Sequence, residues 1–310
     1  KKDKHKSPNK KETIEKLKEK VKNDEAFAEI INDINELGEF EKMFDGILIS
    51  LLSIEKHTKE PLNVYLMTMD LEDIKKEYKP ITEEERQIIE DILKEKNEKN
   101  IVNLVDTSDL YREEFNKNSN QNTHYTPYIF IRIMSDEIEE LPNKVLYLDA
   151  DIIAYRDIKE IFDTDMTNVE IAASLDAIGR KAISPDYMNS GVILMNLDEI
   201  KRTGCFKKAR DICKKKKMVL PDQTALNKAC TEKIYFPDKY NEQHQRQEDT
   251  VLRHFSLTFR AKPYPTYINA KPWQIDEIHK KYNIYDFDDI YDEYERYIKS
   301  FKEIGVYGKE

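Results

Sequence analysis

The stretch Lys144-Val-Leu-Tyr-Leu-Asp-Ala-Asp151 constrains the fold more than any other part of this chain. Its run of apolar residues, 145–148, is typical of a strand buried on both faces. The run ends in two carboxylates, Asp149 and Asp151, which we expect to project side by side because positions i and i+2 of a strand share a face. In open α/β sheets, ligands bind beyond the carboxyl ends of the strands.

Two carboxylates this close repel each other, and a divalent cation removes that repulsion. Carboxylate oxygens suit Mg²⁺ or Mn²⁺, and a cation held in this way usually bridges a pyrophosphate. The sequence therefore favours a metal site at Asp149 and Asp151. The alternative is that the two acids only end the strand and cap the next helix.

The rest of the chain alternates helical and strand-like segments, which predicts an α/β fold with a largely parallel sheet. Helices are expected over 43–55, 82–96 and 286–304, where apolar residues recur at helical spacing. Thr82 and Glu85 form a capping-box signature at the start of the second helix. Strands are expected over 62–70, 101–106, 144–151, 169–176, 190–197 and 233–238.

Residues 1–42 differ in character from the rest of the chain. A basic start is followed by apolar residues at helical spacing from Ile14 to Leu37, and Gly38 is a plausible stop signal. We predict a helical N-terminal appendage over 1–42 and one large domain over 43–310.

Composition excludes several classes of protein. The chain has 51 Lys and Arg against 61 Asp and Glu, and this acidic balance argues against a nucleic-acid partner. No apolar run approaches the ~18 residues of a membrane span, and no signal peptide is recognised. The 3 cysteines lack metal-type spacing, which suits a reducing compartment. The usual glycine-rich phosphate loops are absent.

Four segments resemble those of glycosyltransferase family 8, in the family's order and with about its spacing. This family includes glycogenins and bacterial lipopolysaccharide galactosyl- and glucosyltransferases. Residues 145–165 resemble its metal-binding segment, and residues 187–196 resemble its Asn-Ala/Ser-Gly-Val strand. Residues 220–227 resemble its Asp-Gln-x-x-Leu-Asn helix start. His254-Phe255, followed by Lys271-Pro272-Trp273, resembles its closing element.

The resemblance implies a GT-A-like fold, with a mixed, mostly parallel sheet flanked by helices and the sugar nucleotide at the strand ends. It implies metal-dependent transfer of a hexose, glucose or galactose, from a UDP-sugar to a hydroxyl, with retention of configuration. Mn²⁺ or Mg²⁺ is the implied cofactor. The implied acceptor is a glycan or lipid-linked saccharide of a bacterial surface, as in lipopolysaccharide biosynthesis, at a cytoplasmic site with membrane association as an option.

Matching positions imply the roles of individual residues. Asp149, Asp151 and His254 would be the metal ligands, although a buried histidine is also common in cores. The donor would contact Arg132, Asn189, Gly191 and Lys271, with Lys271 neutralising the leaving diphosphate. An ion pair, a turn or a surface lysine would explain these residues equally simply.

Three further matches concern the reaction itself. Gln223 would lie beside the anomeric carbon, while Asp222 and Asp176 would orient the sugar or the acceptor. The simpler readings are a helix N-terminus for Asp222 and Gln223 and a strand-end cap for Asp176. No carboxylate is clearly placed as a nucleophile, so we favour front-face attack by the acceptor over a covalent intermediate.

The chain departs from the family in two places. Family members begin with an apolar strand that contacts uracil and ribose, and residues 38–42 do not provide one. The segment after His254 lacks a family glycine, and Arg260 or Lys262 could take the role of Lys271. The departures leave two alternatives: a catalytically impaired relative acting as a binding or scaffold protein, or a metal-dependent phosphate-transfer enzyme.

Overall fold

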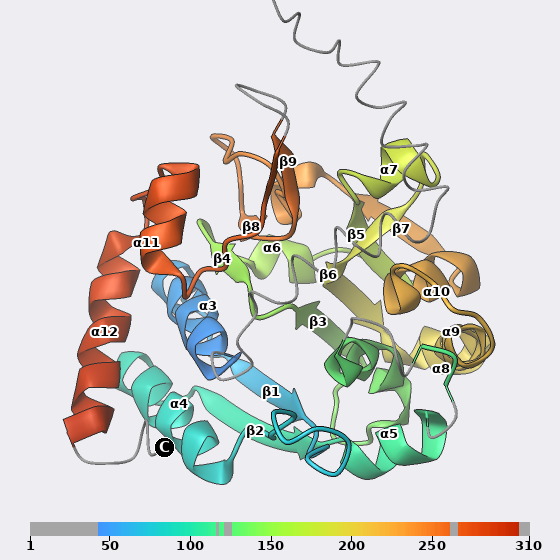
Figure 1. Cartoon of the computed structure of the whole chain (residues 1–310), viewed down its shortest axis with the longest axis horizontal. Coiled ribbons are helices and arrows are strands. Elements are labelled where there is room, and N and C mark those ends of the chain that lie inside the picture. Colours follow the sequence, from blue (N-terminus) through green and yellow to red (C-terminus); the bar gives the residue numbers. More distant parts are fainter. Residues whose placement is uncertain (1–42, 116–117, 121–125, 261–265, 304–310) are drawn as a thin grey trace, which may run out of the picture.

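The computed structural model describes residues 43–115, 118–120, 126–260 and 266–303. The helical appendage predicted for residues 1–42 lies outside this part of the chain, as do Lys262 and the side chain of Arg260. The described residues form a mixed α/β structure in which several short sheets are flanked by helices (Figure 1). The predicted fold class is confirmed.

The first layer is a parallel pair of strands with its helices. It comprises α3 (Met43–His57), β1 (Asn63–Thr68), α4 (Glu83–Lys96), β2 (Ile101–Asp106) and α5 (Ser108–Phe115). β1 and β2 pair in parallel, with Asn63 opposite Ile101. The helix α4 begins where the sequence predicts, because both hydrogen bonds of the Thr82–Glu85 capping box are present.

A four-stranded sheet forms the centre of the molecule. Its order is β3 (Lys144–Leu148), β6 (Met188–Asn196), β5 (Ile171–Leu175) and β7 (Lys233–Phe236). β5 and β7 are parallel, but β6 runs antiparallel to both of its neighbours. The expected predominance of parallel pairing is therefore wrong for this sheet. β5 and β6 are joined by residues 176–187, whose helix is the four-residue α7, so no long crossover helix returns the chain to the opposite end of the sheet.

Two small antiparallel ladders complete the sheet structure. β4 (Ile152–Ala154) pairs with β8 (Leu252–His254), and β9 (Thr258–Arg260) pairs with β10 (Thr266–Ile268). β4 follows β3 in the chain after a short turn, so the pairing of β4 with β8 places β8 beside the end of β3.

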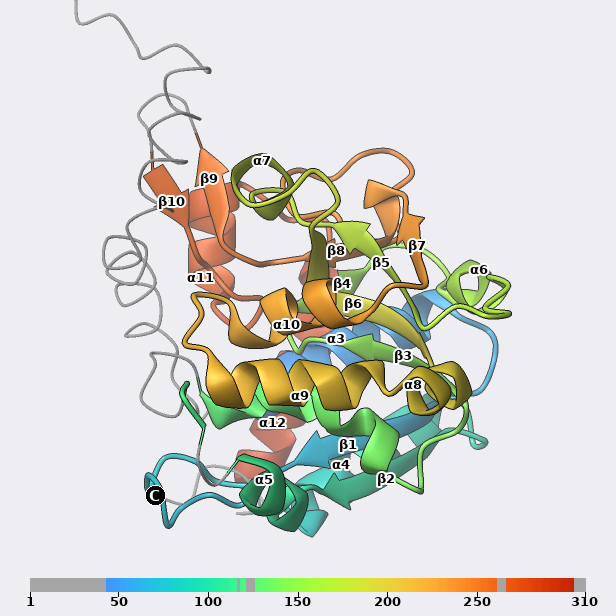
Figure 2. The same cartoon turned by 90° about the vertical axis from the view of Figure 1, so that its right-hand side faces the viewer.

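Helices from both ends of the chain enclose these sheets (Figures 1 and 2). The helices α8 (Leu197–Thr203), α9 (Cys205–Lys215) and α10 (Pro221–Ala229) pack with the 3₁₀ helix η2 (Pro127–Glu137) against β6. The closing helix α12 (Asp288–Glu303), predicted over 286–304, packs on α3. Shorter helices are α6 (Lys159–Phe162), α7 (Gly179–Ala182), η3 (Asp238–Tyr240), α11 (Ile275–Glu277) and η4 (Ile278–Tyr282).

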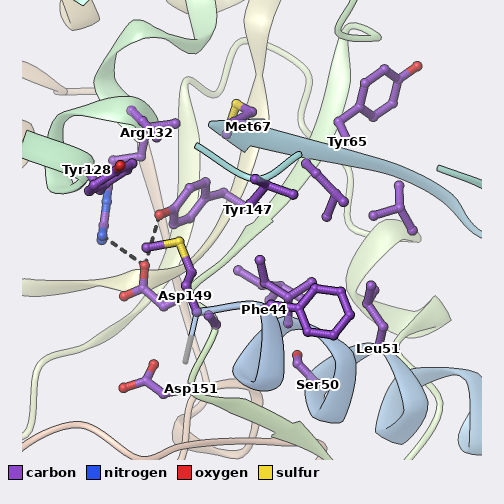
Figure 3. Close-up of a pocket in the computed structure, with 18 of the residues that line it drawn as sticks. Phe44, Ser50, Leu51, Tyr65, Met67, Tyr128, Arg132, Tyr147, Asp149 and Asp151 are labelled. Carbon is purple, nitrogen blue, oxygen red and sulfur yellow. Dashed lines mark hydrogen bonds and ion pairs between the residues drawn. The ribbon is translucent and has the colours of Figure 1, made fainter. Parts of the chain in front are cut away.

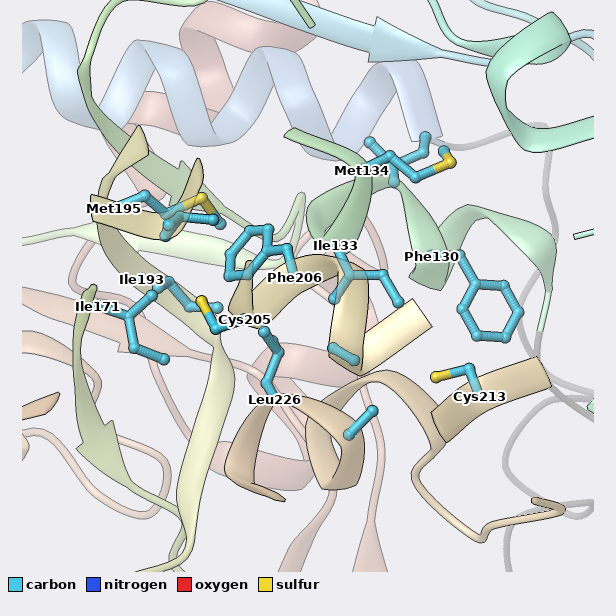
Figure 4. Close-up of a cluster of buried hydrophobic side chains, with 14 of the residues drawn as sticks. Phe130, Ile133, Met134, Ile171, Ile193, Met195, Cys205, Phe206, Cys213 and Leu226 are labelled. Atoms are coloured by element: carbon cyan, nitrogen blue, oxygen red, sulfur yellow. The ribbon is translucent and has the colours of Figure 1, made fainter. Parts of the chain in front are cut away.

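The core beneath the central sheet is continuous and apolar. Side chains of β5 and β6, such as Ile171 and Ile193, meet Phe206 of α9 and Leu226 of α10 (Figure 4). All of these side chains are buried. This packing holds β6 rigidly, and the polar end of β6 carries residues of the candidate active site. No helix among the described residues is both long enough and apolar enough to cross a membrane.

β3 differs from its neighbour β6 in burial. We expect its apolar run to be buried on both faces, but all its residues are only half-buried. The cause is a cavity of about 2590 Å³ between β3, β1 and α3, which we call the groove. Among the described strands, β1 pairs only with β2, and β3 pairs only with β6, so one edge of each strand remains open.

Candidate active site

Asp149 and Asp151 lie in the turn that joins β3 to β4. β3 ends at Leu148, and the backbone N–H of Asp149 donates to the carbonyl of Gly191 at 2.8 Å. The expectation that both acids share one face of a strand is therefore wrong, since neither residue is in a strand. Their carboxylates nevertheless converge with His254, and the ligand atoms of the three residues lie within 4.8 Å of one another.

The register of the β4–β8 ladder brings His254 to the two acids. His254 pairs with Ile152, the residue directly after Asp151. As a result, His254 Nε2 lies 3.2 Å from Asp151 Oδ1 and 3.9 Å from Asp149 Oδ2. Residues that are a hundred positions apart in sequence thus form one cluster.

A chain of amide hydrogen bonds fixes the tautomer of His254. The carboxylate of Asp176 can only accept, so Asn189 donates its Nδ2 to Asp176 at 2.9 Å. Asn189 Oδ1 then accepts from Asn241 Nδ2 at 2.9 Å. Asn241 Oδ1 consequently faces His254 Nδ1 at 3.2 Å, and the ring must donate there. The lone pair of neutral His254 is therefore on Nε2, which points toward Asp149 and Asp151.

Gly191 allows these groups to meet. A Cβ atom at this position would lie 2.2 Å from His254 Cε1 and 2.9 Å from Asp149 Oδ2. No side chain can occupy that space without moving the imidazole. Here the value of glycine is its small size, because it lets the backbone of β6 approach the acids closely.

Each acid forms an ion pair through only one of its oxygens. Asp149 Oδ1 accepts from Arg132 Nη2 at 2.8 Å, and Asp151 Oδ2 accepts from Lys271 Nζ at 2.5 Å. The opposite oxygens, Asp149 Oδ2 and Asp151 Oδ1, face His254. Burial opposes the charge of Asp151, but the Lys271 ammonium holds the pKa of this carboxyl below its usual range. Asp151 is therefore available as an anionic ligand.

The donor set fits a divalent cation. Asp151 Oδ1 is buried and accepts no hydrogen bond from any described residue, because Lys271 pairs with the opposite oxygen, and a buried polar atom without a hydrogen-bond partner is costly. Two carboxylate oxygens and one imidazole lone pair form a set that suits Mn²⁺, and carboxylates also suit Mg²⁺. The geometry at Asp149, Asp151 and His254 is thus compatible with the metal site predicted from the sequence.

A second group of site residues surrounds Arg132. This buried side chain from η2 donates to the carbonyl and hydroxyl of Ser190 at 2.7 Å, and its Nε lies 3.3 Å from Asp222 Oδ2. Burial works against the charge of Arg132, but the neighbouring Asp149 raises its pKa, so the guanidinium stays charged. Burial raises the pKa of Asp222, and the positive charge of Arg132 offsets only part of this increase.

Gln223 and Asp176 are held in fixed orientations. Gln223 Oε1 accepts from the backbone N–H of Ser190 at 3.0 Å, and its Nε2 donates to Asp176 Oδ2 at 3.2 Å. Asp176 also accepts from Asn189 and from the backbone N–H groups of Ile178 and Gly179. These four hydrogen bonds occupy the lone-pair positions of the carboxylate. In this arrangement Asp176 orients Gln223 and Asn189.

The structure joins every predicted site residue into one network, and it adds three that sequence reasoning missed. Ser190 links Arg132 to Gln223, Asn241 orients His254, and Tyr147 donates to Asp149 Oδ1 at 2.9 Å. Ser190 lies between two predicted residues, Asn189 and Gly191, and this position is a usable signal. Nothing in the sequence around Asn241 marks it.

The network opens onto the groove. Figure 3 shows Arg132, Tyr147 and Asp149 at one end of it, with Tyr65 and Met67 of β1 and Phe44 and Leu51 of α3 along its sides. The site therefore lies at the end of a long, largely apolar cavity, on the open edge of β3.

Comparison with curated proteins finds relatives among bacterial glycosyltransferases. A putative glycosyltransferase of Haemophilus influenzae is 26% identical over 204 residues, covering 61% of this chain and 57% of the relative. The lipopolysaccharide 1,3-galactosyltransferase of Salmonella typhimurium is 30% identical over 172 residues, covering 50% of each protein. The chain thus spans little more than half the length of these curated relatives.

Among solved structures, a glycosyltransferase also resembles this fold. The crystal structure of the galactosyltransferase LgtC in complex with donor and acceptor sugar analogs has a TM-score of 0.58 at 16% identity. The match covers 83% of this chain and 93% of that one, and it identifies a GT-A fold. Residues 41–277 match the family described as glycosyl transferase family 8. Because this match covers most of the chain and includes the whole network around Asp149, the chain belongs to glycosyl transferase family 8.

Proposed function

We propose that this protein transfers a hexose, glucose or galactose, from a UDP-sugar to a hydroxyl of a bacterial surface glycan or lipid-linked saccharide, with retention of configuration. The observation that carries the proposal is the convergence of Asp149, Asp151 and His254 around Asp151 Oδ1, a buried carboxylate oxygen that accepts no hydrogen bond from the described residues. The proposal includes a cytoplasmic location, because that is where such a donor and free thiols are expected, with membrane association as an option. The division of the chain into an appendage, residues 1–42, and one domain, residues 43–310, is also part of this proposal.

Asp149, Asp151 and His254 would hold the metal. A bound Mn²⁺ or Mg²⁺ would supply neutralisation of the charge on the leaving diphosphate, an effect of several kcal/mol on the barrier. The chain adds its own cation at the same place, since Lys271 Nζ lies 2.5 Å from Asp151. Arg132 is another fixed positive charge beside Asp149, and both side chains would lower the energy of a developing anion.

The contacts of the polar residues support front-face attack by the acceptor. A nucleophilic carboxylate needs a free oxygen, but Asp176 has four hydrogen-bond donors around it. Asp222 is buried beside Arg132, with Ser190 Oγ 3.3 Å from its Oδ2. Gln223, fixed at both ends of its amide, would serve as a polar neighbour of the anomeric carbon. A glycosyl adduct trapped on Asp222 or Asp176 would overturn this part of the proposal.

The direct test is product formation. The full chain should release UDP from UDP-glucose or UDP-galactose in the presence of Mn²⁺, and EDTA should stop the reaction. Comparing the two donors with the same sample identifies the sugar. Release of inorganic phosphate in place of UDP would instead support the phosphate-transfer alternative.

The groove favours one alternative function. The site lies beside an open strand edge, at the position where the family's first strand is not found among the described residues. A relative in this state could bind glycans or proteins without catalysis. Titration calorimetry separates the two functions, since an enzyme should give heat with UDP and Mn²⁺ and a scaffold protein should give none.

A further inference from the structure

A second cluster of metal-ligating side chains shares no residue with the network around Asp149. It comprises Glu170, Cys205 and Cys230, whose ligand atoms all lie within 4.8 Å of one another. Glu170 directly precedes β5, Cys205 is the first residue of α9, and Cys230 directly follows α10. These residues are far apart in sequence, which explains why the spacing of the cysteines gives no metal-type motif. Folding alone brings the three side chains together.

Glu170 is an unusual residue for the core of a domain, because it is only 1% exposed. Among the described residues it forms no ion pair, whereas buried carboxylates are normally either paired with a cation or bound to a metal. The backbone N–H groups of Thr231 and Glu232 donate to Glu170 Oε2 at 2.7 and 3.1 Å. No described residue donates to Oε1, so one carboxylate oxygen remains available to a cation.

The two thiols beside this carboxylate are equally buried. Cys205 belongs to the apolar core that includes Ile171 and Ile193 of the central sheet (Figure 4). A hydrogen bond with Cys205, together with burial, raises the pKa of the Cys230 thiol well above its usual range. Cys230 therefore carries a proton when no cation is bound. Thiols bind a cation as thiolates, so each thiol that becomes a ligand releases its proton to the solvent.

The dimensions of the cluster fit a tetrahedral zinc ion. Typical bonds are about 2.3 Å from zinc to sulfur and about 2.1 Å from zinc to a carboxylate oxygen. At tetrahedral angles, such bonds place neighbouring ligand atoms roughly 3.5–3.8 Å apart. The three ligand atoms therefore have to close by about 1 Å at most. The cluster is thus close to a coordination geometry before any metal is bound.

We propose that Glu170, Cys205 and Cys230 bind Zn²⁺, with a water molecule as the fourth ligand. Thiolate sulfur is a soft ligand that favours zinc, whereas the carboxylate-rich set at Asp149 suits Mn²⁺. The proposed site goes beyond the transfer reaction. It would tie the C-terminal end of α10 to β5 and α9, and the first turn of α10 carries Asp222. A bound zinc would therefore stabilise the elements that support the candidate active site.

The test uses Co²⁺, which takes the place of Zn²⁺ in tetrahedral sites and gives a thiolate-to-metal absorption band in the near ultraviolet. The full chain, stripped of metal and kept reduced with a phosphine, is titrated with Co²⁺. A second sample is refolded from urea with Co²⁺ present, so that access to the buried ligands does not limit binding. We expect the band to appear and to saturate, and Zn²⁺ to remove it.

Variants assign the band to the cluster. Cys205→Ser or Cys230→Ser should abolish it. Cys213→Ser should retain it, because Cys213 is also a buried free thiol but donates to the Pro221 carbonyl, outside the cluster. Asp151→Asn should keep the band and lose Mn²⁺-dependent binding of UDP. This difference separates a failure of the zinc site from a failure of the proposed function.

Glu170→Gln tests the third ligand and keeps its hydrogen bonds. The amide oxygen can still accept from the backbone N–H groups of Thr231 and Glu232, but the charge is lost. The affinity for Co²⁺ should fall about tenfold or more, while the band returns at saturating Co²⁺. The same readout applies if a serine variant fails to fold.

Four results would overturn the proposal. These are the absence of a thiolate band in both samples, a band that persists in Cys205→Ser, a band that is also lost in folded Cys213→Ser, and equal Co²⁺ affinity in Glu170→Gln and the parent protein.

Discussion

At the scale of residues, the site depends on polar side chains that hold one imidazole in one orientation. The amide chain from Asp176 through Asn189 and Asn241 determines which nitrogen of His254 carries the proton. Hydrogen-bond partners of this kind orient the residues that ligate a metal and thereby tune its affinity.

Replacing Asn241 should therefore weaken metal binding without touching a ligand. In Asn241→Leu the ring of His254 loses its acceptor, and we expect Mn²⁺ affinity to fall about 10- to 100-fold, measured by calorimetry. The matched control is Asn100→Ala. Asn100 is equally buried and bonds to Leu62 and Leu93, far from the site, so its loss should lower stability and leave Mn²⁺ affinity unchanged. Equal Mn²⁺ affinity in both variants would contradict this role of Asn241.

Two glycine-to-alanine variants distinguish a steric clash at the site from strain in the backbone. In Gly191→Ala the new methyl group would collide with His254, so Mn²⁺ affinity should fall at least tenfold. In Gly204→Ala the methyl group meets nothing within 4 Å, but the backbone has φ of +65°. That variant should lose about 1 kcal/mol of stability in chemical denaturation and keep its affinity for Mn²⁺. Retained metal binding in Gly191→Ala would show that the close approach is unimportant.

The predicted site residues share a property that explains why sequence could find them. Asp149, Asp151, Asn189 and Gly191 sit at or next to strand ends within short motifs, where position in the chain determines position in the sheet. Asn241 has no such motif, because its role arises only from the packing of η3 and the residues after it against β8. Its contribution follows from tertiary structure alone.

At the scale of elements, local signals predict boundaries well. The start of α4 is set by hydrogen bonds between residues three positions apart, so it can be read from the sequence. The half-exposure of β3 could not be read in this way, since burial depends on which element lies on its far side.

The capping box of α4 gives a prediction at this scale. Thr82→Ala removes the acceptor for the Glu85 N–H, and we expect a loss of about 1 kcal/mol in the free energy of unfolding. Thr82→Ser keeps the hydroxyl and should stay close to the parent protein. Urea denaturation measures both variants, and equal stability of Thr82→Ala and the parent protein would argue against the cap.

Arg210 ties η2 to α9 and thereby supports Arg132. Its buried guanidinium donates to the Ile133 carbonyl at 2.7 Å and pairs with Asp136 and Glu137. In Arg210→Ala the buried Asp136 loses its partner, so we expect a loss of about 3–5 kcal/mol in urea denaturation. Arg202→Ala, on an exposed pair with Glu199, should cost about 1 kcal/mol or less. Similar losses of unfolding free energy in the two variants would show that the buried ion pairs of Arg210 stabilise the fold no more than an exposed pair does.

At the scale of the whole molecule, the sequence predicts an α/β fold because strands and helices alternate along most of the chain. Residues 38–42 are charged and short of apolar residues, so the sequence does not show the family's first strand there. What the sequence cannot predict is how β1 and β3 are placed relative to each other. The structure answers that point for the described residues: β1 and β3 keep their places on either side of the groove, and the carboxylates at the end of β3 still meet His254.

The central claim is that Asp149, Asp151 and His254 bind a cation that is needed for nucleotide binding. Calorimetric titration of the full chain with UDP, with and without Mn²⁺, tests it most directly. We predict binding only with Mn²⁺, a loss of at least tenfold in Asp151→Asn, and no change in Asp163→Asn, an exposed acid paired with Lys159. Binding of UDP that is unaffected by EDTA, or equal affinity in Asp151→Asn and the parent protein, would contradict the account.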